Sequence, residues 1–504
     1  MKKILINKNI WQTRVAVLRD DKLQDIYFDT HSKEELEKSF IKGKVSKVLP
    51  GIQTAFVDIG QRKAGFLHIS EIDRALATEK TAEFMHVDDS EQELIKKKVK
   101  KAISIEKIFS PGDEILVQVI KEPIYEKGAK LTTCFTLPGK FIVLMPNIPQ
   151  IGISKKISDR EERIRLKEIL LKNLPKKMGA IIRTTMEGRK AKDLKKDLSF
   201  LVATWKSILK KFKKAKYGEI IHRDLRITLR AIREHFDEDV EILFTDNKQD
   251  QAAIQKFVKN FVPEQVKKIK YYQGPPGLFE KFEIDKQINK ALEKKVYLKS
   301  GGSLIIETTE AMTVIDVNTG KFTGKDNPEE TILKTNLEAA EEVVRQLRLR
   351  NIGGLIVIDF IDMSSVNNKQ KLSRFLEKTL KERDKYQSVL LKVSEFGLIQ
   401  MTRKRSGKTL VQQLTNVCPR CNSYGFIRSA QTLSFEVLTN FKNEAIKNNI
   451  KGSISLITSE AVFSHLIHKE FQSIIKLEKS LGCKIVLESD KDLQSDQYRI
   501  EKVK

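Results

Sequence analysis

The sequence is short of cysteine, of long apolar runs and of acidic residues. Only four cysteines occur among 504 residues, Cys134, Cys418, Cys421 and Cys483, which excludes a disulfide framework and indicates a reducing compartment. No signal-peptide core follows "MKKILINKNI", and no run of about 18 apolar residues predicts a membrane-spanning helix. We therefore expect a cytoplasmic protein, or one of the plastid stroma if the gene is organellar.

The shortage of acids leaves a strongly basic chain. Lysine and arginine number 93 against 67 aspartates and glutamates, a formal net charge of +26. Such a field attracts polyanions, so nucleic acid is the favoured partner and an anionic membrane surface the second. An AT-rich genome would explain an excess of lysine over arginine, but not the excess of basic over acidic residues. With 40% hydrophobic residues, a chain of this length predicts several globular domains.

The first half of the chain alternates between strand and helix patterns. Residues 1–38 resemble a hairpin followed by a polar helix, and residues 42–70 are short alternating strands cut by turn residues, which predicts a small barrel. The stretch "GDEILVQVIKEP" would close that barrel. Residues 134–230 mix strands with two amphipathic helices. The second helix ends in the basic run 210–216, either a solvated helix end or a phosphate contact.

The second half carries the clearest pattern. Residues 231–292 contain a strand and a helix that could pair with the N-terminal hairpin. Within 293–413, a hairpin ending in "MTVIDVN" is followed by a long helix and by "LIVIDF". This order predicts a parallel strand pair joined by a right-handed crossover. The apolar run "LIVIDF" predicts a strand covered on both faces, and the helix and strand that follow should repeat the unit.

Two acids mark the ends of those strands. Asp316 ends one strand and Asp359 the next, so both carboxylates should project at one sheet edge, where open α/β sheets bind ligands. Asn318 shares the strand face of Asp316, and Asp362 lies in the same loop region as Asp359. Paired carboxylates without histidine or cysteine favour magnesium or manganese. The alternative is a pair of ordinary turn acids, but a basic chain with such a site suggests phosphodiester hydrolysis.

Aromatic residues in the predicted barrel supply a second candidate site. The segment "TAFVDIGQRKAGFLHIS" holds Phe56, Phe66 and His68, and the last two share a strand face. Aromatic side chains on an OB-type barrel stack unpaired bases. The alternative is that Phe56 and Phe66 belong to the barrel core.

The segment "CPRCNSYG" supplies a third. Cys418 and Cys421 form one C-x-x-C knuckle, but a structural zinc needs four ligands and no second C-x-x-C exists. Two copies of the chain could each give two thiolates to a shared zinc. A redox pair and two unliganded thiols are the alternatives.

These features together resemble the ribonuclease E/G family over nearly the whole chain. The matching stretches are "GIQTAFVDIGQRKAGFLHISEI", "FIVLMPNIPQIGISKK", "AIIRTT", "VIDVNTG", "NLEAAEEVVRQLRLRNIGGLIVIDFIDM" and "CPRC". The resemblance implies an endoribonuclease with a multidomain α/β and β fold. Its implied parts are an RNase H-like part (1–38 and 231–292), an OB-type RNA-binding barrel (39–133), a 5′-sensor (134–230), a DNase I-like catalytic domain (293–413), a zinc link (414–428) and a small C-terminal α/β dimerisation domain (429–504).

The resemblance also implies residue roles. Asp316 and Asp359 match magnesium-binding acids, with Asn318 as the amide beside them. The remaining matches are Phe56, Phe66 and Lys127 in the RNA-binding barrel, with His68 on the same face as Phe66; Arg183, Thr184 and Val143 in a pocket that reads a 5′-monophosphate; and Cys418 and Cys421 in a zinc link between protomers. An arginine fork beside a hydroxyl also suits a terminal phosphate on chemical grounds.

The chain departs from the family pattern at two points. Lys155 in "GISKK" stands where the family commonly has arginine; lysine keeps the charge but loses the bidentate fork, so preference for 5′-monophosphate ends should weaken. The chain also stops at Lys504 without a long scaffold tail, so we expect the short ribonuclease G type or a tail-less ribonuclease E.

The leading hypothesis is a magnesium-dependent endoribonuclease, acting as a homodimer or homotetramer. It would cut single-stranded RNA to 5′-phosphate and 3′-hydroxyl ends, in precursors of rRNA and tRNA and in mRNA. The alternatives are a non-catalytic RNA-binding or ribosome-assembly factor on the same scaffold and a DNA nuclease.

Overall fold

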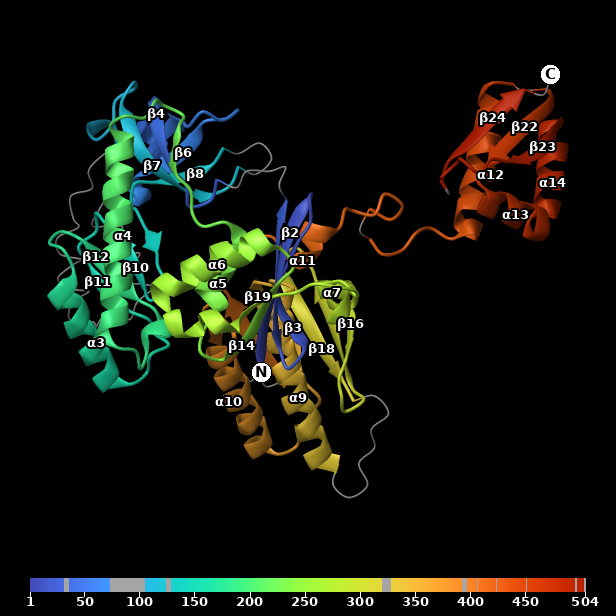
Figure 1. Ribbon diagram of the computed structural model, residues 1–504. Coiled ribbons are helices and arrows are strands. Elements are labelled where there is room, and N and C mark those ends of the chain that lie inside the picture. Colours follow the sequence, from blue (N-terminus) through green and yellow to red (C-terminus); the bar gives the residue numbers. More distant parts are fainter. Residues whose placement is uncertain are drawn as a thin grey trace. The chain divides into compact units, whose positions relative to one another are not determined.

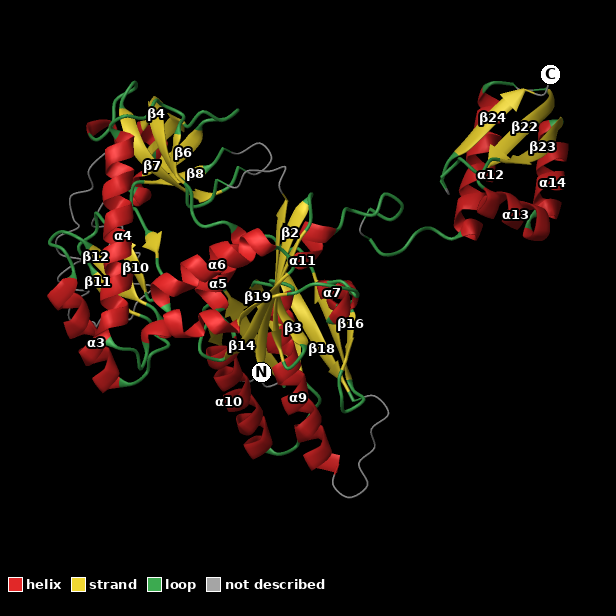
Figure 2. Ribbon diagram, in the orientation of Figure 1, coloured by secondary structure: helices red, strands yellow, loops and turns green. Residues whose placement is uncertain are grey.

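The computed structural model divides into two compact units, Met1–Leu410 and Val411–Lys504, and each is described by itself. It describes residues 1–30, 36–72, 105–123, 128–319, 328–391, 397–405, 407–422, 424–449, 451–494 and 496–502, without the side chains of Asn260 and Pro328. Figure 1 follows the chain by colour, and Figure 2 separates helices from strands. Within the described ranges, no helix is long and apolar enough to cross a membrane.

The first sheet joins the N-terminal strands to a segment more than 200 residues away. Its order is β15-β14-β1-β2-β3, and β1 pairs in parallel with β14, as the sequence suggested. Helices pack on it through buried residues such as Ile232 and Ile288. The strands are β1 (Lys2–Lys8), β2 (Gln12–Arg19), β3 (Lys22–Thr30), β14 (Val240–Thr245) and β15 (Ile269–Tyr271), and the helices are α5 (Ile227–His235), α6 (Lys248–Phe261), α7 (Leu278–Lys281) and α8 (Ile284–Leu292).

A closed barrel follows. The order β4-β5-β6-β8-β7, with β7 pairing back to β4, closes a five-stranded ring, and β13 adds to the outer side of β4. Gly60 and Gly218 pin β13 in place: both have positive φ, and a Cβ on Gly60 would lie 2.8 Å from the Gly218 Cα. The strands are β4 (Phe40–Leu49), β5 (Thr54–Asp58), β6 (Gly65–His68), β7 (Glu114–Lys121), β8 (Lys130–Thr132) and β13 (Ile220–His222).

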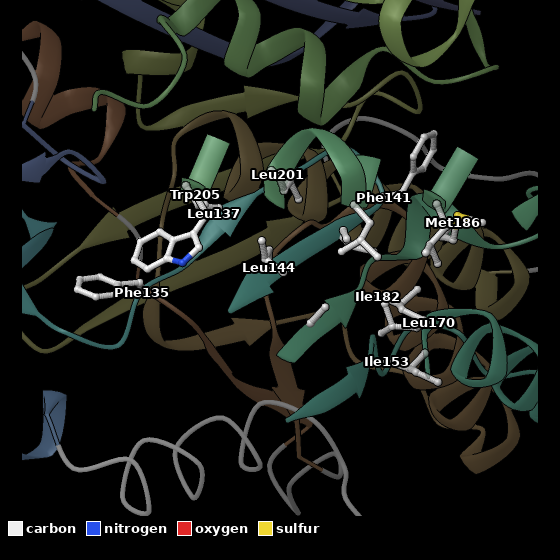
Figure 3. Packing of buried hydrophobic residues seen from close by; sticks show 14 of the residues in the cluster. Phe135, Leu137, Phe141, Leu144, Ile153, Leu170, Ile182, Met186, Leu201 and Trp205 are labelled. Atoms are coloured by element: carbon white, nitrogen blue, oxygen red, sulfur yellow. The ribbon is translucent and has the colours of Figure 1, made fainter. Parts of the chain in front are cut away.

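A third sheet packs against two helices, as the patterns of residues 134–230 predict. Its order is β11-β12-β10-β9, and Figure 3 shows Trp205 and Leu201 of α4 packed with Leu144 of β10 and Ile182 of β12. Asp159 caps α3 by accepting the Glu161 N–H. The elements are β9 (Leu137–Pro138), β10 (Ile142–Met145), β11 (Ile151–Ile153), β12 (Gly179–Ile182), α3 (Arg160–Asn173) and α4 (Ala191–Phe212).

The fourth sheet holds the two strand-end acids. Its order is β16-β17-β18-β19-β21-β20, and α9 and α10 cover one face through a core that includes Ile315 and Ile356. Acidic Glu329 and Glu330 begin α9, Arg348 lies in its last turn, and Asn351 with φ +52° follows its end, where the Ile352 N–H donates to the Leu347 carbonyl. The elements are β16 (Lys295–Tyr297), β17 (Ser303–Thr308), β18 (Met312–Asn318), β19 (Gly354–Asp359), β20 (Ser388–Leu390), β21 (Leu398–Arg403), α9 (Pro328–Leu349) and α10 (Val366–Arg383).

Two expectations for this sheet are wrong. β19 is not covered on both faces: Leu355 is 38% exposed, as is Val314 on β18, so the face away from α9 is open in the described chain. The strand after α10 also does not repeat the parallel unit beside β19, because β21 lies between β19 and β20 and is antiparallel to both. Single-strand apolarity does not reveal either fact, since both depend on which elements pack nearby.

A buried ionic cluster joins the first and fourth sheets. Asp25 of β3, 3% exposed, accepts from the Arg348 Nε at 3.0 Å and from the Lys385 Nζ at 3.3 Å. Burial alone would raise the pKa of Asp25, but Arg348 and Lys385 hold it well below its ordinary value. Lys385 also donates to the Tyr27 hydroxyl, which lies 2.7 Å from the His235 Nε2. The two sheets therefore share one charged core.

The second unit is small and mixed. β22 pairs in parallel with β23 and antiparallel with β24, and the helices pack on this sheet around Phe441 and Leu466 (Figure 2). The elements are α12 (Ala430–Lys447), α13 (Glu460–Lys469), α14 (Phe471–Leu481), β22 (Gly452–Thr458), β23 (Cys483–Ser489) and β24 (Tyr498–Lys502). The short helix α11 (Leu410–Leu414) lies at the junction of the two units.

Candidate nuclease site

The strand register places the two acids opposite each other. β18 and β19 run in parallel, and Asp316 and Asp359 are Cα partners at the end of the ladder. Adjacent strands lie about 4.8 Å apart, so the two carboxylates share one short stretch of the sheet. Both side chains are exposed, on the face that α9 and α10 leave open. The acids therefore meet at the sheet edge that their sequence positions predict.

Among the described residues, the charge on this pair has no counter-ion. No described lysine, arginine or histidine forms an ion pair with Asp316 or Asp359. Burial, followed by the charges of Asp316 and Asp362, raises the pKa of Asp359. The Asn318 Nδ2 donates to the Asp316 Oδ2 at 2.7 Å, so the amide orients that carboxylate. Within the described part of the chain, the site is an anionic patch with one carboxylate held in place.

The loop after Asp359 is held by residues that the sequence analysis did not single out. Buried Asn336 of α9 donates to the Ile361 carbonyl at 2.8 Å and accepts the Ile361 N–H at 3.1 Å. Glu329 accepts the backbone N–H groups of Ser364 and Ser365. Asn336 stands on the apolar face of an amphipathic helix, and a polar residue in that position was the available signal.

The donor set fits a hard divalent cation. Two in-register carboxylates offer oxygen ligands and negative charge, which magnesium prefers. Asp362 is exposed and contributes to the field at Asp359, but the described part of the chain holds no group of three or more candidate ligands. Two carboxylates suit magnesium, because that ion is commonly bound by one or two carboxylates with water and substrate phosphates completing its shell.

The barrel places its aromatics on the outer surface. Phe56 of β5 and Phe66 of β6 are register partners, both are half-buried, and neither belongs to the barrel core. Lys47 of β4 lies opposite Phe56 on its other side and is exposed. Two adjacent outward rings with a lysine beside them form a platform suited to unpaired bases. The predicted contact at residue 127 lies outside the described residues.

His68 has a local structural task. It shares the outward side of β6 with Phe66, but its Nδ1 accepts the Ser70 N–H at 3.2 Å and lies 2.9 Å from the Ser70 hydroxyl. The imidazole thereby caps the short turn Ile69–Glu71. The other ring nitrogen, Nε2, takes no part in this cap.

The predicted phosphate pocket collects around the end of β12. Val143 pairs with Ile181, Arg183 follows β12, and Thr184 begins the turn Thr184–Met186. The Ser154 N–H donates to the Ile182 carbonyl, which joins the end of β11 to the end of β12. Lys155 follows the first of these strand ends and Arg183 follows the second. Lys155 is half-buried and engaged in an interaction of its own. The four predicted residues thus come from adjoining strand ends.

Arg183 is already paired. Its guanidinium forms an ion pair with Glu234 of α5, and its Nη1 donates to the Gly139 carbonyl at 2.8 Å. Burial alone would raise the pKa of Glu234, but Arg183, with Arg233, lowers it to about 2. Glu234 is therefore ionised and occupies the fork that a terminal phosphate would need. Nothing in the sequence around Arg183 indicates this partner.

The loop beneath Arg183 is fixed by a buried acid. Asp197 of α4 is fully buried and accepts the backbone N–H groups of Phe141 at 2.7 Å and Ile142 at 3.1 Å. A Cβ on Gly139 would lie 2.4 Å from an Asp197 oxygen, so only glycine fits there. Burial raises the pKa of Asp197. An acid on the apolar face of α4 was the sequence signal for this support.

The C-x-x-C motif forms a tight turn in the second unit. The Asn422 N–H donates to the Cys418 carbonyl at 2.8 Å, and the Tyr424 N–H donates to the Cys421 carbonyl at 2.7 Å. Hydrogen bonds from the backbone of Cys421 and Arg420 lower the pKa of the exposed Cys418 thiol. Two neighbouring thiols with backbone N–H groups directed at sulfur fit half of a tetrahedral zinc site.

Three family models match the chain. Residues 136–406 match the ribonuclease E/G family, residues 37–131 the S1 RNA binding domain, and residues 417–503 the RNase E/G thioredoxin-like domain. The S1 match covers the closed barrel, and the thioredoxin-like match covers the small mixed sheet.

Named relatives match over most or all of the chain. The chain is 34% identical over 502 residues to Ribonuclease G of Escherichia coli (strain K12), with 99% of each chain covered. It is 35% identical over 436 residues to Ribonuclease G of Salmonella typhimurium (strain SL1344), with 86% of each covered. Against Ribonuclease E of Buchnera aphidicola subsp. Schizaphis graminum (strain Sg) it is 34% identical over 509 residues, which span 51% of that protein.

Proposed function

The chain belongs to the ribonuclease E/G family and is an endoribonuclease, and we propose that it cleaves single-stranded RNA with magnesium held by Asp316 and Asp359. The observation that carries this proposal is the register of β18 and β19, which puts the two carboxylates opposite each other, with no ion pair to a described lysine, arginine or histidine. The ribonuclease relatives and the S1 match set aside the alternatives of a non-catalytic factor and a DNA nuclease.

Each part of the site has a separate task in this proposal. Asp316 and Asp359 supply the negative oxygen donors, and Asn318 keeps the Asp316 carboxylate in one orientation. A divalent cation bound there would supply charge neutralisation at the scissile phosphate and activation of water. Asn336 and Glu329 hold the loop after Asp359 so that the donors keep their spacing. In-line attack of water on phosphorus breaks the bond to the 3′-oxygen, which leaves a 5′-phosphate and a 3′-hydroxyl.

Substrate selection follows from the barrel and the β12 pocket. Phe56 and Phe66 would stack two unpaired bases, so a structured duplex should be a poor substrate. Arg183 and Thr184, with Val143 and Lys155 beside them, would receive a 5′-monophosphate once Glu234 releases the fork. Substrates of this kind include precursors of rRNA and tRNA and mRNA.

The proposal is tested by cleavage of one short RNA carrying either a 5′-monophosphate or a 5′-hydroxyl, with and without magnesium. We expect Asp316→Asn to abolish cleavage while RNA binding persists, and EDTA to stop the wild-type enzyme. The control is Glu307→Gln, an exposed acid on β17 of the same sheet that pairs with Lys294 outside the acid pair. Cleavage by Asp316→Asn at the wild-type rate would exclude the proposed metal site.

For the second unit, we propose that Cys418 and Cys421 bind zinc together with the same two residues of a partner subunit. The thiol pair supplies two of four ligands, and the described residues contain no second C-x-x-C. The expected stoichiometry is half an equivalent of zinc per chain, with loss of zinc and of the homodimer in Cys418→Ser. One zinc per chain, or a stable metal-free dimer, would refute sharing.

A further inference from the structure

A lysine-lined hollow lies where α4 ends beside the barrel. It has a volume of about 470 Å³ and lies between the C-terminal end of the helix and strand β13. None of the residues proposed for cleavage or for the 5′-phosphate lines it. Its lining residues are Ser207, Lys210, Lys211, Lys214, Ala215, Glu219, Ile220 and Ile221.

The three lysines lie on one face of the helix end. Lys214 follows Lys210 by four residues and Lys211 by three, and this spacing brings the like charges together. All three are exposed, and no described carboxylate lies within ion-pair distance of them. Glu219 is the one acid in the lining, and its Oε2 accepts the Lys216 backbone N–H. The hollow therefore has an excess of positive charge.

The helix dipole explains only part of this arrangement. Lysines at a helix C-terminus are favoured on every side, because the exposed carbonyl groups carry partial negative charge. That effect does not require three repelling lysines around one concave surface. The surface is concave and is lined by lysines without a described acidic partner and by Ile220 and Ile221 of β13. Such a surface is suited to a bound polyanion, which neutralises several lysines at once.

Strand β4 of the barrel links the hollow to the aromatic platform. β13 pairs with β4, the Lys42 N–H donates to the Glu219 carbonyl at 3.1 Å, and the Lys42 ammonium lies 5.3 Å from the centre of the Phe212 ring. On β4 the exposed residues Lys44 and Lys47 continue toward β5. Along β4 the order is thus Lys47 opposite Phe56 of β5, then Lys44, then the stretch Phe40–Ile41 that pairs with β13 and the hollow. Figure 1 shows α4 beside the barrel strands β4 and β7.

We propose that this hollow is a second RNA-binding site, which holds backbone phosphates of the strand that leaves the aromatic platform across β4. It rests on the proposed function, since RNA is the substrate in both. The site reads no bases: lysine ammonium groups contact phosphate oxygens, so it favours long RNAs over short ones regardless of sequence.

The test compares two charge-removing variants of the full chain. The site variant is Lys210→Gln with Lys211→Gln and Lys214→Gln. The control removes three exposed lysines on or just after another helix in the same unit, Lys167 and Lys172 of α3 and Lys176 beyond its end, by Lys167→Gln with Lys172→Gln and Lys176→Gln. Both carry Asp316→Asn so that RNA is bound but not cut. Binding of unstructured RNAs of about 6 and about 30 nucleotides is measured by anisotropy over a salt series, because one OB-type fold occupies about 4–16 nucleotides.

We expect the site variant to bind the long RNA about tenfold more weakly, with a salt slope reduced by up to about 2, since each single-strand phosphate contact contributes about 0.7. The short RNA should bind the site variant as it binds its parent, and the control should keep the parent's slope. An equal loss in the control, or no loss for the long RNA, overturns the inference alone. Failure of the parent to bind even the short RNA overturns the proposed function and the inference together.

A second measurement uses the wild-type chain, so that it does not depend on the folding of a variant. Lysine acetylation is mapped by mass spectrometry in EDTA with the long RNA, the short RNA or neither. We expect Lys210, Lys211 and Lys214 to be protected by the long RNA and not by the short one. Equal reactivity of these lysines in all three samples overturns the proposal.

Discussion

Replacing Glu234 with glutamine should sharpen the choice between RNA 5′ ends. Glu234 holds the Arg183 guanidinium in an ion pair, so a 5′-phosphate that binds as we propose would have to compete with a carboxylate. Glu234→Gln keeps the size of the side chain and removes the competing charge. The Gly139 carbonyl still accepts from the Arg183 Nη1, so the fork should stay near its present position.

The size of the effect follows from the pKa of Glu234. Burial alone would raise that pKa, yet Arg183 and Arg233 lower it from 4.5 to about 2. This lowering corresponds to about 3 kcal/mol of net preference for the ionised form. Arg233 contributes part of this preference, and solvent screens the Glu234 side chain, which is 32% exposed. We therefore assign about half of the 3 kcal/mol to the ion pair with Arg183, with which a phosphate would compete. About 1.5 kcal/mol is a change of about tenfold.

The assay is kcat/KM for two RNAs that differ only in a 5′-monophosphate or a 5′-hydroxyl. In Glu234→Gln the ratio of monophosphate to hydroxyl should rise about tenfold, while the rate on the hydroxyl RNA stays near wild type. Glu241→Gln, which removes an exposed acid from β14, is the matched control and should leave the ratio unchanged. A ratio that falls would mean that Glu234 positions Arg183; an unchanged ratio would mean that Arg183 does not bind the 5′-phosphate.

Two further predictions concern stability and RNA affinity. Burial lowers the pKa of His235 to about 3, so between pH 3 and about pH 6.5 the imidazole binds a proton only in the unfolded chain. The free energy of unfolding should therefore fall by about 2 kcal/mol from pH 7 to pH 5. Urea titrations at these two pH values should show that His235→Gln lacks most of this loss. Phe66→Leu should weaken single-stranded RNA binding by about tenfold, since stacking contributes about 1–3 kcal/mol per base, while melting changes little because Phe66 lies outside the core. If Phe66→Leu bound single-stranded RNA with unchanged affinity, the Phe66 ring would have only a structural role.

The position of the acid pair at one end of the β18–β19 ladder could be predicted because its determinants are local. Asp316 and Asp359 each end an apolar strand, and the helix between them is long enough for a crossover, so parallel pairing follows from chain geometry. The orientation of Asn318 follows in the same way, because residues two apart share a strand face. These inferences need no knowledge of distant elements.

The parts that could not be predicted depend on contacts between distant segments. Glu234 lies 51 residues from Arg183, and only the packing of α5 against the β12 end brings them together. The open face of β19 and the insertion of β21 beside it depend on which elements cover the sheet. The lysine-lined hollow also needs β13 to pair with β4 across the barrel, which a charge run alone does not reveal.

The charged core around Asp25 sets an order for synthesis of the chain. Lys385 lies 360 residues after Asp25, and Arg348 lies 323 residues after it. At about 5–20 residues per second, the ribosome makes those partners roughly 20–70 s later. Until then the nascent N-terminal hairpin carries a carboxylate whose burial would leave it without its cations. The first sheet should therefore close late, after helix α9 has left the ribosome, because Asp25 can be buried with its cations only once Arg348 and Lys385 have been made.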